Sequence, residues 1–434
     1  MRTAVFLCAL VLLTAAAAVR ADMVVELEDG RRFVLPVDRH EVRRIRFSDG
    51  TELSGGRIRL LEGAEPEAPQ AAPAPTPGAR VLRVSPDGPF FRPSEAAAAA
   101  RDGDVVEIAA GRYVDVAVWR ASDLVIRGVG GRPVIDGGGR GAEGKAVWVI
   151  RGERVRIEDV ELTGSAVADR NGAGIRAEGA DLELVRTSIH HNEMGVLVAA
   201  SFRGTLAVRE SEIFANGTDH ERYGVPPGHQ IYASGGDLLL VEGSWIHGLA
   251  GGHGIKSRAR RNEIRCSRIE DGEGAGSYLV DIAEAAPTLI AGSVLVQGER
   301  AENRTLVSFG AEGGDPDARL TLAFSTLETR IPRAVFVANR TPTPAYVAAT
   351  VTVGDGLPAD GPVRMAATFA FASAEAGGLD PRTLVPRPSS PVVDAAADPG
   401  LRGMVPACSP GERAGSVPRR VAGAAPDAGA FEAR

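Results

Sequence analysis

Residues 155–162 read Val-Arg-Ile-Glu-Asp-Val-Glu-Leu, and the same arrangement returns along the chain, for example as Leu-Ala-Val-Arg-Glu-Ser-Glu-Ile at 206–213. Each copy places one aliphatic residue five positions before another, with polar or small residues between them. The pairs are Ile157/Leu162, Leu184/Ile189, Val208/Ile213, Val241/Ile246, Ile264/Ile269, Ile290/Leu295 and Leu322/Leu327. A repeat of roughly 20–30 residues with occasional insertions is typical of a solenoid.

Apolar and polar residues alternate within each copy, which is the pattern of a β-strand rather than of a helix. One copy is too small to bury its apolar face alone, but stacked copies form a continuous core. The aromatic content of only 5% suits a narrow interior filled by Leu, Ile and Val. We therefore predict an all-β fold, a right-handed parallel β-helix solenoid. A leucine-rich repeat fits less well because its helical half and leucine spacing are missing.

Two asparagines lie at equivalent places in this repeat. Asn192 and Asn216 each come three residues after the second aliphatic residue of a pair. Such residues either stack at a turn and bond backbone groups of neighbouring copies, or are ordinary turn residues. The sequence leaves both interpretations open.

The N-terminal residues have the pattern of a secretory signal peptide. Arg2 gives the positive start, residues 4–18 the apolar run, and Val19-Arg20-Ala21 a small-residue cleavage site. The run is shorter than the roughly 20 apolar residues of a spanning helix, and no later stretch is long enough. We therefore expect a secreted or periplasmic protein without a membrane span.

Composition limits the partners. The 434-residue chain has 49 Lys and Arg residues against 56 Asp and Glu, a formal net charge of −7. Proteins dedicated to nucleic acid need a net basic surface, so we expect no such partner. Beyond the signal segment only Cys266 and Cys408 remain, and the sequence leaves open whether they pair.

The chain divides into five expected segments. Alternating runs around Asp29-Gly30 and Asp49-Gly50 have hairpin-turn signals, and the stretch that follows is rich in Pro and Ala. The segments are a signal peptide at 1–21, a small separate N-terminal β module at 22–62, a Pro/Ala-rich linker at 63–79, the parallel β-helix at 80–355 and a partly irregular C-terminal closing segment at 356–434.

Both ends of the solenoid carry capping signals. Pro93-Ser94-Glu95 followed by alanines predicts a short N-terminal capping helix with Ser94 as its N-cap. The segment from Asp87 to Tyr113 resembles the entry segment of pectate-lyase-like β-helix proteins. Residues 390–394 and 426–432 resemble the closing segments of bacterial β-helix repeat proteins. These resemblances imply architecture rather than chemistry.

Two segments match in register one turn apart, Gly-His-Gln-Ile-Tyr-Ala-Ser at 228–234 and Gly-His-Gly-Ile-Lys-Ser-Arg at 252–258. The longer spacing before the first places a polar loop with His220 beside this pair. If the two isoleucines face inward, alternation points the neighbouring histidines inward and one Tyr, one Lys and one Arg to solvent. The outward residues are Tyr232, Lys256 and Arg258, and the inward ones His229, His253 and Ser257.

The two segments and the polar loop beside them form the walls of an expected groove, and the following strand extends it. Residues 277–281 read Ser-Tyr-Leu-Val-Asp, which we expect to place Asp281 beside Arg258 and Leu279 at the position matching Lys256. Glu312 lies beyond the next strand. Stacked His229 and His253 are expected to be hydrogen-bonded structural groups or to contact substrate.

Lysine is rare in this chain. Lys145 and Lys256 are the only two lysines among 49 cationic residues. Unlike arginine, lysine can lose its proton and act as a base, especially beside other cations. Arg258, Arg260 and Arg261 would supply that field and bind carboxylates. The alternative is a solvated cation on a basic strand.

The groove resembles the active faces of β-helix polysaccharide lyases, including chondroitinase-B-like and alginate lyases. The resemblance implies Lys256 as base, an Arg on the next turn as acid, and often calcium held by carboxylates, here among Glu299, Glu302 and Glu312. The next-turn Arg is missing. Residues 252–255 resemble the Gly-His-Gly-Ile of polygalacturonases, without their paired aspartates. Residues 228–312 also resemble a group of bacterial exported β-helix repeat proteins with no established activity.

These observations give three hypotheses. The first is a lyase or C5-epimerase acting on an acidic polysaccharide; the second is a non-catalytic glycan-binding or cell-envelope scaffold; the third is a secreted adhesin. For the first, the expected catalytic residues are Lys256, Arg258, Tyr232 and His220, and the expected substrate-binding residues are His229, His253, Arg260, Asp281 and Glu312. Calcium is a candidate cofactor, a glycan the expected partner, and a monomer the expected state.

Overall fold

The computed structural model describes residues 78–218 and 220–433, together with four short strands nearer the N-terminus. The chain forms two compact units, Met1–Ala71 and Ala72–Arg434. The signal peptide predicted at 1–21 and most of the linker lie outside the described residues. In the described part, no helix is both long and apolar enough to cross a membrane.

The first unit contains two antiparallel strand pairs. β1 (Met23–Glu26) pairs with β2 (Arg32–Leu35), and β3 (Arg44–Arg46) pairs with β4 (Glu52–Ser54). The turns predicted at Asp29-Gly30 and Asp49-Gly50 lie outside the described residues.

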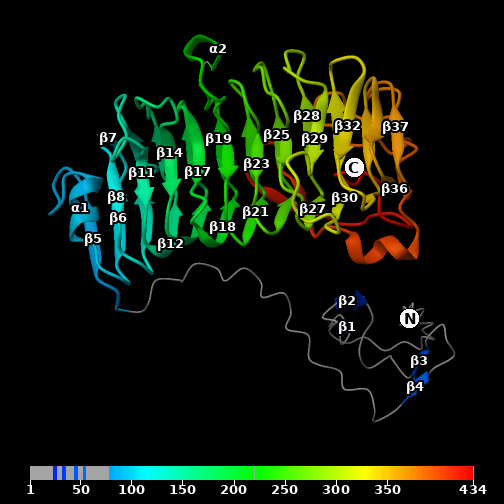
Figure 1. Cartoon of the computed structure of the whole chain (residues 1–434), viewed down its shortest axis with the longest axis horizontal. Helices are drawn as coiled ribbons and strands as arrows, with labels where there is room; N and C mark the ends of the chain where they lie inside the picture. Colours follow the sequence, from blue (N-terminus) through cyan, green and yellow to red (C-terminus); the bar gives the residue numbers. More distant parts are fainter. Residues whose placement is uncertain are drawn as a thin grey trace. The chain divides into compact units, whose positions relative to one another are not determined.

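The second unit is a stack of three parallel sheets that the chain visits in rotation (Figure 1). Sheet I contains β5 (Val81–Val84), β6 (Val105–Ala109), β9 (Val125–Val129), β12 (Glu153–Glu158), β15 (Ala180–Val185), β18 (Arg203–Arg209), β21 (Leu238–Glu242), β24 (Asn262–Arg265), β27 (Thr288–Ala291), β30 (Leu320–Ala323), β33 (Ala345–Ala348) and β36 (Val363–Ala366). Sheet II contains β7 (Arg112–Val114), β10 (Val134–Asp136), β13 (Glu161–Thr163), β16 (Ser188–His190), β19 (Glu212–Phe214), β22 (Trp245–His247), β25 (Arg268–Glu270), β28 (Val294–Gln297), β31 (Thr326–Thr329), β34 (Val351–Val353) and β37 (Phe369–Phe371). Sheet III contains β8 (Ala117–Trp119), β11 (Ala146–Ile150), β14 (Ala173–Ala177), β17 (Met194–Val198), β20 (Ile231–Ala233), β23 (Ile255–Ser257), β26 (Val280–Ile282), β29 (Thr305–Phe309), β32 (Ala334–Asn339) and β35 (Gly356–Asp360).

The aliphatic pairs of the repeat form two columns in the core. Val208, Val241 and Ile264 are direct neighbours in sheet I, and the second members of the pairs line up in sheet II. These side chains are almost fully buried and belong to one hydrophobic cluster. The all-β class and the parallel β-helix predicted from the repeat are therefore confirmed.

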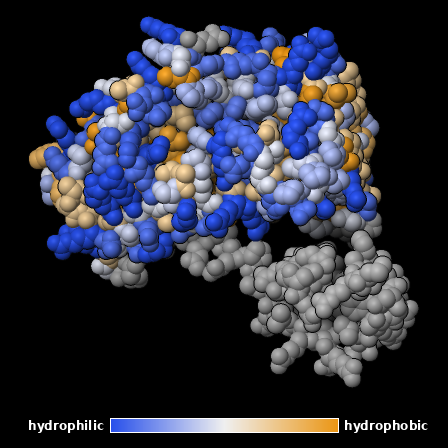
Figure 2. All heavy atoms as spheres, in the orientation of Figure 1, coloured by the Kyte–Doolittle hydropathy of each residue, from blue (hydrophilic) through white to orange (hydrophobic). Residues whose placement is uncertain are grey.

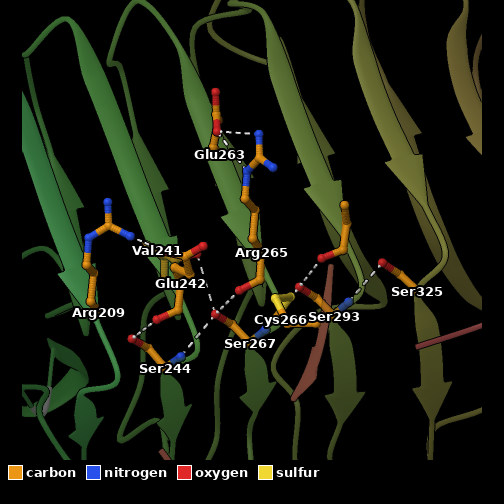
Figure 3. The surroundings of a disulfide bond; sticks show 12 residues. Arg209, Val241, Glu242, Ser244, Glu263, Arg265, Cys266, Ser267, Ser293 and Ser325 are labelled. Carbon is orange, nitrogen blue, oxygen red and sulfur yellow. Dashed lines mark hydrogen bonds and ion pairs between the residues drawn. A yellow bond between two sulfur atoms is a disulfide. The ribbon is translucent and has the colours of Figure 1, made fainter. Parts of the chain in front are cut away.

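Polar ladders connect the turns between sheets. Asn192 Nδ2 donates to Asn216 Oδ1 at 3.0 Å, and Asn216 Nδ2 donates to Gln230 Oε1 at 2.7 Å. Both asparagines are buried, so the stacked interpretation holds. A second ladder of buried hydroxyls, at the corner between sheets I and II, was not predicted (Figure 3). Each backbone N–H donates to the next hydroxyl at 3.1–3.2 Å along Thr187, Ser211, Ser244, Ser267, Ser293 and Ser325.

The capping helix α1 (Pro93–Ala99) covers one end of the stack, but Ser94 is not its N-cap. Arg92 occupies the N-cap without a side-chain cap bond, and Pro93 takes the first helical position, which suits its fixed φ. The Glu95 carboxylate instead accepts a hydrogen bond from the Phe91 N–H at 2.8 Å.

At the other end, β35, β36 and β37 add a further turn beyond residue 355, where the closing segment was expected to begin. The tail then contains the 3₁₀ helix η1 (Pro399–Met404) and a hairpin of β38 (Cys408–Pro410) and β39 (Ser416–Pro418). A disulfide joins Cys408 to Cys266, with the Cα atoms 5.7 Å apart. Cys266 lies at the corner next to Ser267 (Figure 3).

Candidate functional site

Four neighbouring strands of sheet III place polar side chains in one column. Tyr232 on β20 is aligned with Lys256 on β23, then with Asp281 on β26 and Ser308 on β29. The alternating residues Ile231 and Ile255 are fully buried, which fixes the column on the opposite face. We call Tyr232, Lys256, Arg258, Asp281, Glu284 and Glu312 the Lys256 cluster.

Glu312 connects the two cations of the cluster. Its Oε1 lies 2.7 Å from Lys256 Nζ, and its Oε2 pairs with Arg258 Nη2. Lys256 Nζ also lies 3.5 Å from Asp281 Oδ2. On its other side Arg258 Nε lies 3.3 Å from Glu284 Oε1. The cluster thus alternates positive and negative groups across three turns.

Tyr232 lies beside both cations. Its hydroxyl accepts a hydrogen bond from Arg258 Nη1. The guanidinium carbon lies 5.4 Å and Lys256 Nζ 6.0 Å from the centre of the tyrosine ring. Ring and cations at these distances attract each other, which fixes the hydroxyl near the ion pairs.

The pKa values of Glu312 and Asp281 are shifted in opposite directions. Hydrogen bonds from Lys256, and also from Arg258, lower the pKa of Glu312, whose side chain is 41% exposed. Burial raises the pKa of Asp281, against the opposing effect of Lys256. The side chain of Asp281 is only 4% exposed. Asp281 is therefore the carboxyl that takes up a proton most readily.

The register between β23 and β26 corrects two expectations from the sequence. Asp281 is the strand neighbour of Lys256 rather than of Arg258, and Leu279 is buried in the core two pairs earlier, level with Gly254. The turn at 271–277, rich in glycine, takes up two residues more than the expected alignment allowed. The position matching Lys256 on the next turn is thus an acid.

The two histidines lie at the edge of the column. His229 and His253 stack with ring centres 4.7 Å apart, and His229 Nδ1 accepts a hydrogen bond from the His253 N–H at 3.0 Å. Burial is the main cause that lowers the pKa of His253 to about 4 and that of His229 well below its ordinary value. Both rings are therefore neutral near pH 7. His229 is buried, which withdraws it from direct contact with a glycan.

Two further predicted residues lie apart from the ion pairs. His220 begins the short helix α2 (His220–Tyr223), which projects from the stack in Figure 1. Within the described chain, no hydrogen bond or ion pair joins His220 to Lys256, Arg258 or Tyr232. Arg260 is largely exposed and pairs with Asp237 at 3.5 Å.

A pocket of about 260 Å³ opens next to Arg258. Arg203, Arg258 and Arg260 line it together with Asp237, Glu284 and the backbone at 234–236. It adds a second cationic surface beside the Lys256 cluster. The face of the molecule seen in Figure 2 is largely hydrophilic, with hydrophobic residues scattered over it.

The described residues do not fit a calcium site. No three His, Cys, Asp or Glu side chains among them are grouped to hold a metal. Glu312 faces Lys256 and Arg258, and such cations repel calcium from its carboxylate. Glu299 and Glu302 are exposed on the preceding loop.

Sequence reasoning missed Glu284 and the pocket. Glu284 follows β26 in Asp-Ile-Ala-Glu, where alternation ends and no motif marks it. The pocket is built from segments of different turns, so only the register between turns could have revealed it.

Comparisons with known proteins agree with the architecture. No family model and no curated protein matches the chain in sequence. Among solved structures, pectate lyase Pel9A matches 84% of this chain and 100% of its own, with a TM-score of 0.50 and 16% identity.

Two further solved structures match with lower scores. An alginate lyase from Paenibacillus sp. str. FPU-7 covers 66% of this chain and 98% of its own, with a TM-score of 0.41 and 12% identity. Pectin methylesterase from carrot covers 70% and 86%, with a TM-score of 0.32 and 13% identity. At such identities only the fold is compared. The chain has the right-handed parallel β-helix fold that is also found in pectate lyase.

Proposed function

We propose that this chain is an exported β-helix protein that acts on an acidic polysaccharide at the Lys256 cluster, by lyase or C5-epimerase chemistry. One contact supports this most directly: a single carboxylate is bound at once by Lys256 and Arg258. The same pair of cations suits the carboxylate of a uronate sugar. The fold shared with a pectate lyase supports the proposal, and the disulfide supports export, because disulfides persist in oxidising compartments.

In the proposed reaction Arg258 holds the uronate carboxylate, and Lys256 as a neutral amine takes the proton from the adjacent carbon, C5. The electron pair forms the C4–C5 double bond as the C4–O bond breaks. The Tyr232 hydroxyl gives its proton to the leaving oxygen. In an epimerase, C5 instead receives a proton from the opposite face and no C–O bond breaks.

Lys256 must lose its own proton first. In the free protein Glu312 and Asp281 both stabilise its positive charge. Asp281 lies 3.5 Å away and its pKa is raised by burial, so it is the nearest group suited to accept that proton. The histidines of the cluster's edge are assigned a structural role, and Arg260 a role in binding the polymer.

The second candidate is a glycan-binding or scaffold protein without turnover. The two carboxylates that pair with Lys256 favour it, because they stabilise an ammonium group, which binds carboxylates but removes no proton. The proposed partner is an acidic polysaccharide for the enzyme and this or another glycan for the binding protein, and a monomer is proposed in both cases.

Lys256→Arg tests the catalytic proposal. The change keeps the positive charge but removes the base, so we expect turnover to fall by about 10²-fold or more while binding persists. Release of unsaturated, ultraviolet-absorbing products from polygalacturonate, alginate and chondroitin measures turnover. An epimerase instead incorporates solvent deuterium at C5.

Lys145→Arg is the matched control. Lys145 also pairs with a glutamate, Glu178, at 2.7 Å, yet lies outside the cluster, so activity should persist. Equal activity of Lys256→Arg and wild type contradicts the assignment of the base. Binding of the polymers without turnover by the wild type favours the scaffold.

A further inference from the structure

The Glu312 carboxylate lies where a ligand carboxylate would bind. Each of its oxygens takes one cation, Oε1 from Lys256 and Oε2 from Arg258. Charge-assisted contacts of this kind are how proteins recognise the carboxylates of bound molecules. No external carboxylate can make both contacts while Glu312 makes them.

The backbone around Glu312 is fixed, so only its side chain needs to move. The Glu312 N–H donates to Ala283 O at 2.8 Å, and Ala285 N–H donates to Gly313 O at 2.7 Å. These bonds attach the loop after β29 to the segment after β26. The Glu312 side chain is 41% exposed, so it can rotate into solvent without breaking them.

Release of Glu312 changes the charge that the site presents. With Glu312 in place, its carboxylate pairs with both Lys256 and Arg258 and offsets part of their positive charge. Without it, Asp281 remains behind Lys256 and Glu284 beside Arg258, and one face of each cation becomes free. The pocket lined by Arg203, Arg258 and Arg260 continues from this point and can take a second anionic unit.

We propose that Glu312 is a built-in competitor that occupies the carboxylate subsite of the free protein and is displaced by a uronate of the ligand. A ligand with two or more carboxylates gains from both the freed subsite and the neighbouring arginines, so the site selects oligomeric uronates over neutral sugars. This inference rests on the proposed acidic ligand but not on turnover.

Glu312→Gln tests this inference, because it removes the competing charge and keeps the size of the side chain. The probes are trigalacturonate and a trimer of alginate, titrated calorimetrically at low ionic strength. We expect the affinity for at least one probe to rise by about tenfold, as for the loss of one competing ion pair. Maltotriose, a neutral trimer, should show no such change.

Glu178→Gln is the matched control. Glu178 also bridges a lysine and an arginine, with 2.7 Å to Lys145 Nζ and 3.1 Å to Arg151 Nε, at the ends of β11 and β14 and outside the lining of the pocket. This variant should bind the acidic trimers as the wild type does. Thermal unfolding of both variants verifies that each remains folded.

Three results would overturn the inference. They are unchanged or weaker binding by folded Glu312→Gln, an equal gain in Glu178→Gln, and failure of every acidic probe to bind either form. If Glu312→Gln binds more tightly but no form shows turnover, the role of Glu312 as a competitor is supported and only the catalytic proposal is contradicted. If the wild type turns over an acidic substrate and Glu312→Gln leaves its KM unchanged, the catalytic proposal is supported and the competitor is contradicted.

Discussion

Two stacked histidines beside the Lys256 cluster show how the fold sets the charge of single residues. The imidazoles of His229 and His253 stack on each other, and each uses Nδ1 to accept a backbone N–H, from His253 and Tyr278 respectively. Both side chains lie in a poorly solvated edge next to Lys256. Burial disfavours the charged form of each ring, and the positive charge of Lys256 adds to this effect, which explains why the pKa of each is lowered.

The lowered pKa of His253 makes stability depend on pH. The folded protein binds this proton only near pH 4, whereas the unfolded chain binds it near pH 6.5. The contribution of neutral His253 to the free energy of unfolding is therefore complete above about pH 6.5 and is lost as the pH falls toward 4. We expect His253 alone to account for a loss of about 2 kcal/mol between pH 7.5 and 5.

Urea unfolding of wild type and His253→Gln at both pH values measures this contribution. The difference at pH 7.5 gives the cost of the substitution itself, and the change in that difference at pH 5 gives the proton-linked part. Asp281, whose raised pKa acts in the opposite direction, is present in both proteins. Parallel pH profiles of the two proteins would contradict a lowered pKa for His253.

At the scale of the residue, the sequence predicted which face of the strand a side chain occupies better than it predicted which residues of the next turn lie beside it. Alternation around Ile231 and Ile255 correctly placed Tyr232 and Lys256 together on the outer face. It could not predict that Asp281 lies next to Lys256, because that depends on the length of an intervening turn. Ion pairs such as those of Glu312 depend on loops that no alternation describes.

At the scale of the element, the asparagine ladder joins turns of the solenoid. Asn216 Nδ2 donates to Ile189 O at 2.9 Å and to Phe214 O at 3.0 Å, while its Oδ1 accepts from Asn192. The side chain is fully buried. One residue therefore satisfies backbone groups from neighbouring turns that water cannot reach.

Asn216→Ala should lower the free energy of unfolding by about 1–3 kcal/mol, because it leaves buried donors and acceptors without partners. Urea unfolding measures the loss. Asn339→Ala removes a buried asparagine outside the ladder, which donates to Thr343 O and Pro362 O, and provides a comparison within the same fold. A change within experimental error at Asn216 would mean that the ladder adds nothing to stability.

The elements differ in how well the sequence revealed them. The aliphatic pairs mark strands of sheets I and II because burial repeats there on every turn. The hydroxyl ladder also has a sequence signal, a Ser or Thr two residues before the second aliphatic residue, but serine is common in loops and was not recognised. Ser94 was misplaced because serine at a helix start is a preference, whereas proline at the first position is a steric constraint.

At the scale of the molecule, the C-terminal tail is attached to the middle of the stack. The disulfide spans 142 residues between Cys266 and Cys408, and Gly415 N–H donates to Gly243 O at 2.6 Å. Buried Arg419 pairs with Glu432 at 2.6 Å and fixes the end of the tail. No local pattern in the sequence could predict which turn the tail contacts.

Replacement of both cysteines by serine should lower the free energy of unfolding by about 2–5 kcal/mol, because the disulfide restricts a long segment of the unfolded chain. Limited proteolysis under native conditions should then cut first near β38 and β39. Reduction of the wild type should give the same result, and reduction of the double variant should change nothing. Equal protease resistance of all forms would mean that other contacts suffice to hold the tail.

The long covalent link also determines how the protein responds to mechanical tension. A pull on the two ends is transmitted through the sulfur atoms from Cys266 directly to Cys408, so the turns between them carry no load. The turns between α1 and Cys266 remain in the path of the load, and they include the strands that carry Tyr232 and Lys256. Tension would therefore act on the strands that carry Tyr232, Lys256 and Arg258, whereas Asp281, Glu284 and Glu312 lie in turns that the disulfide shields, so the load would act across the candidate site.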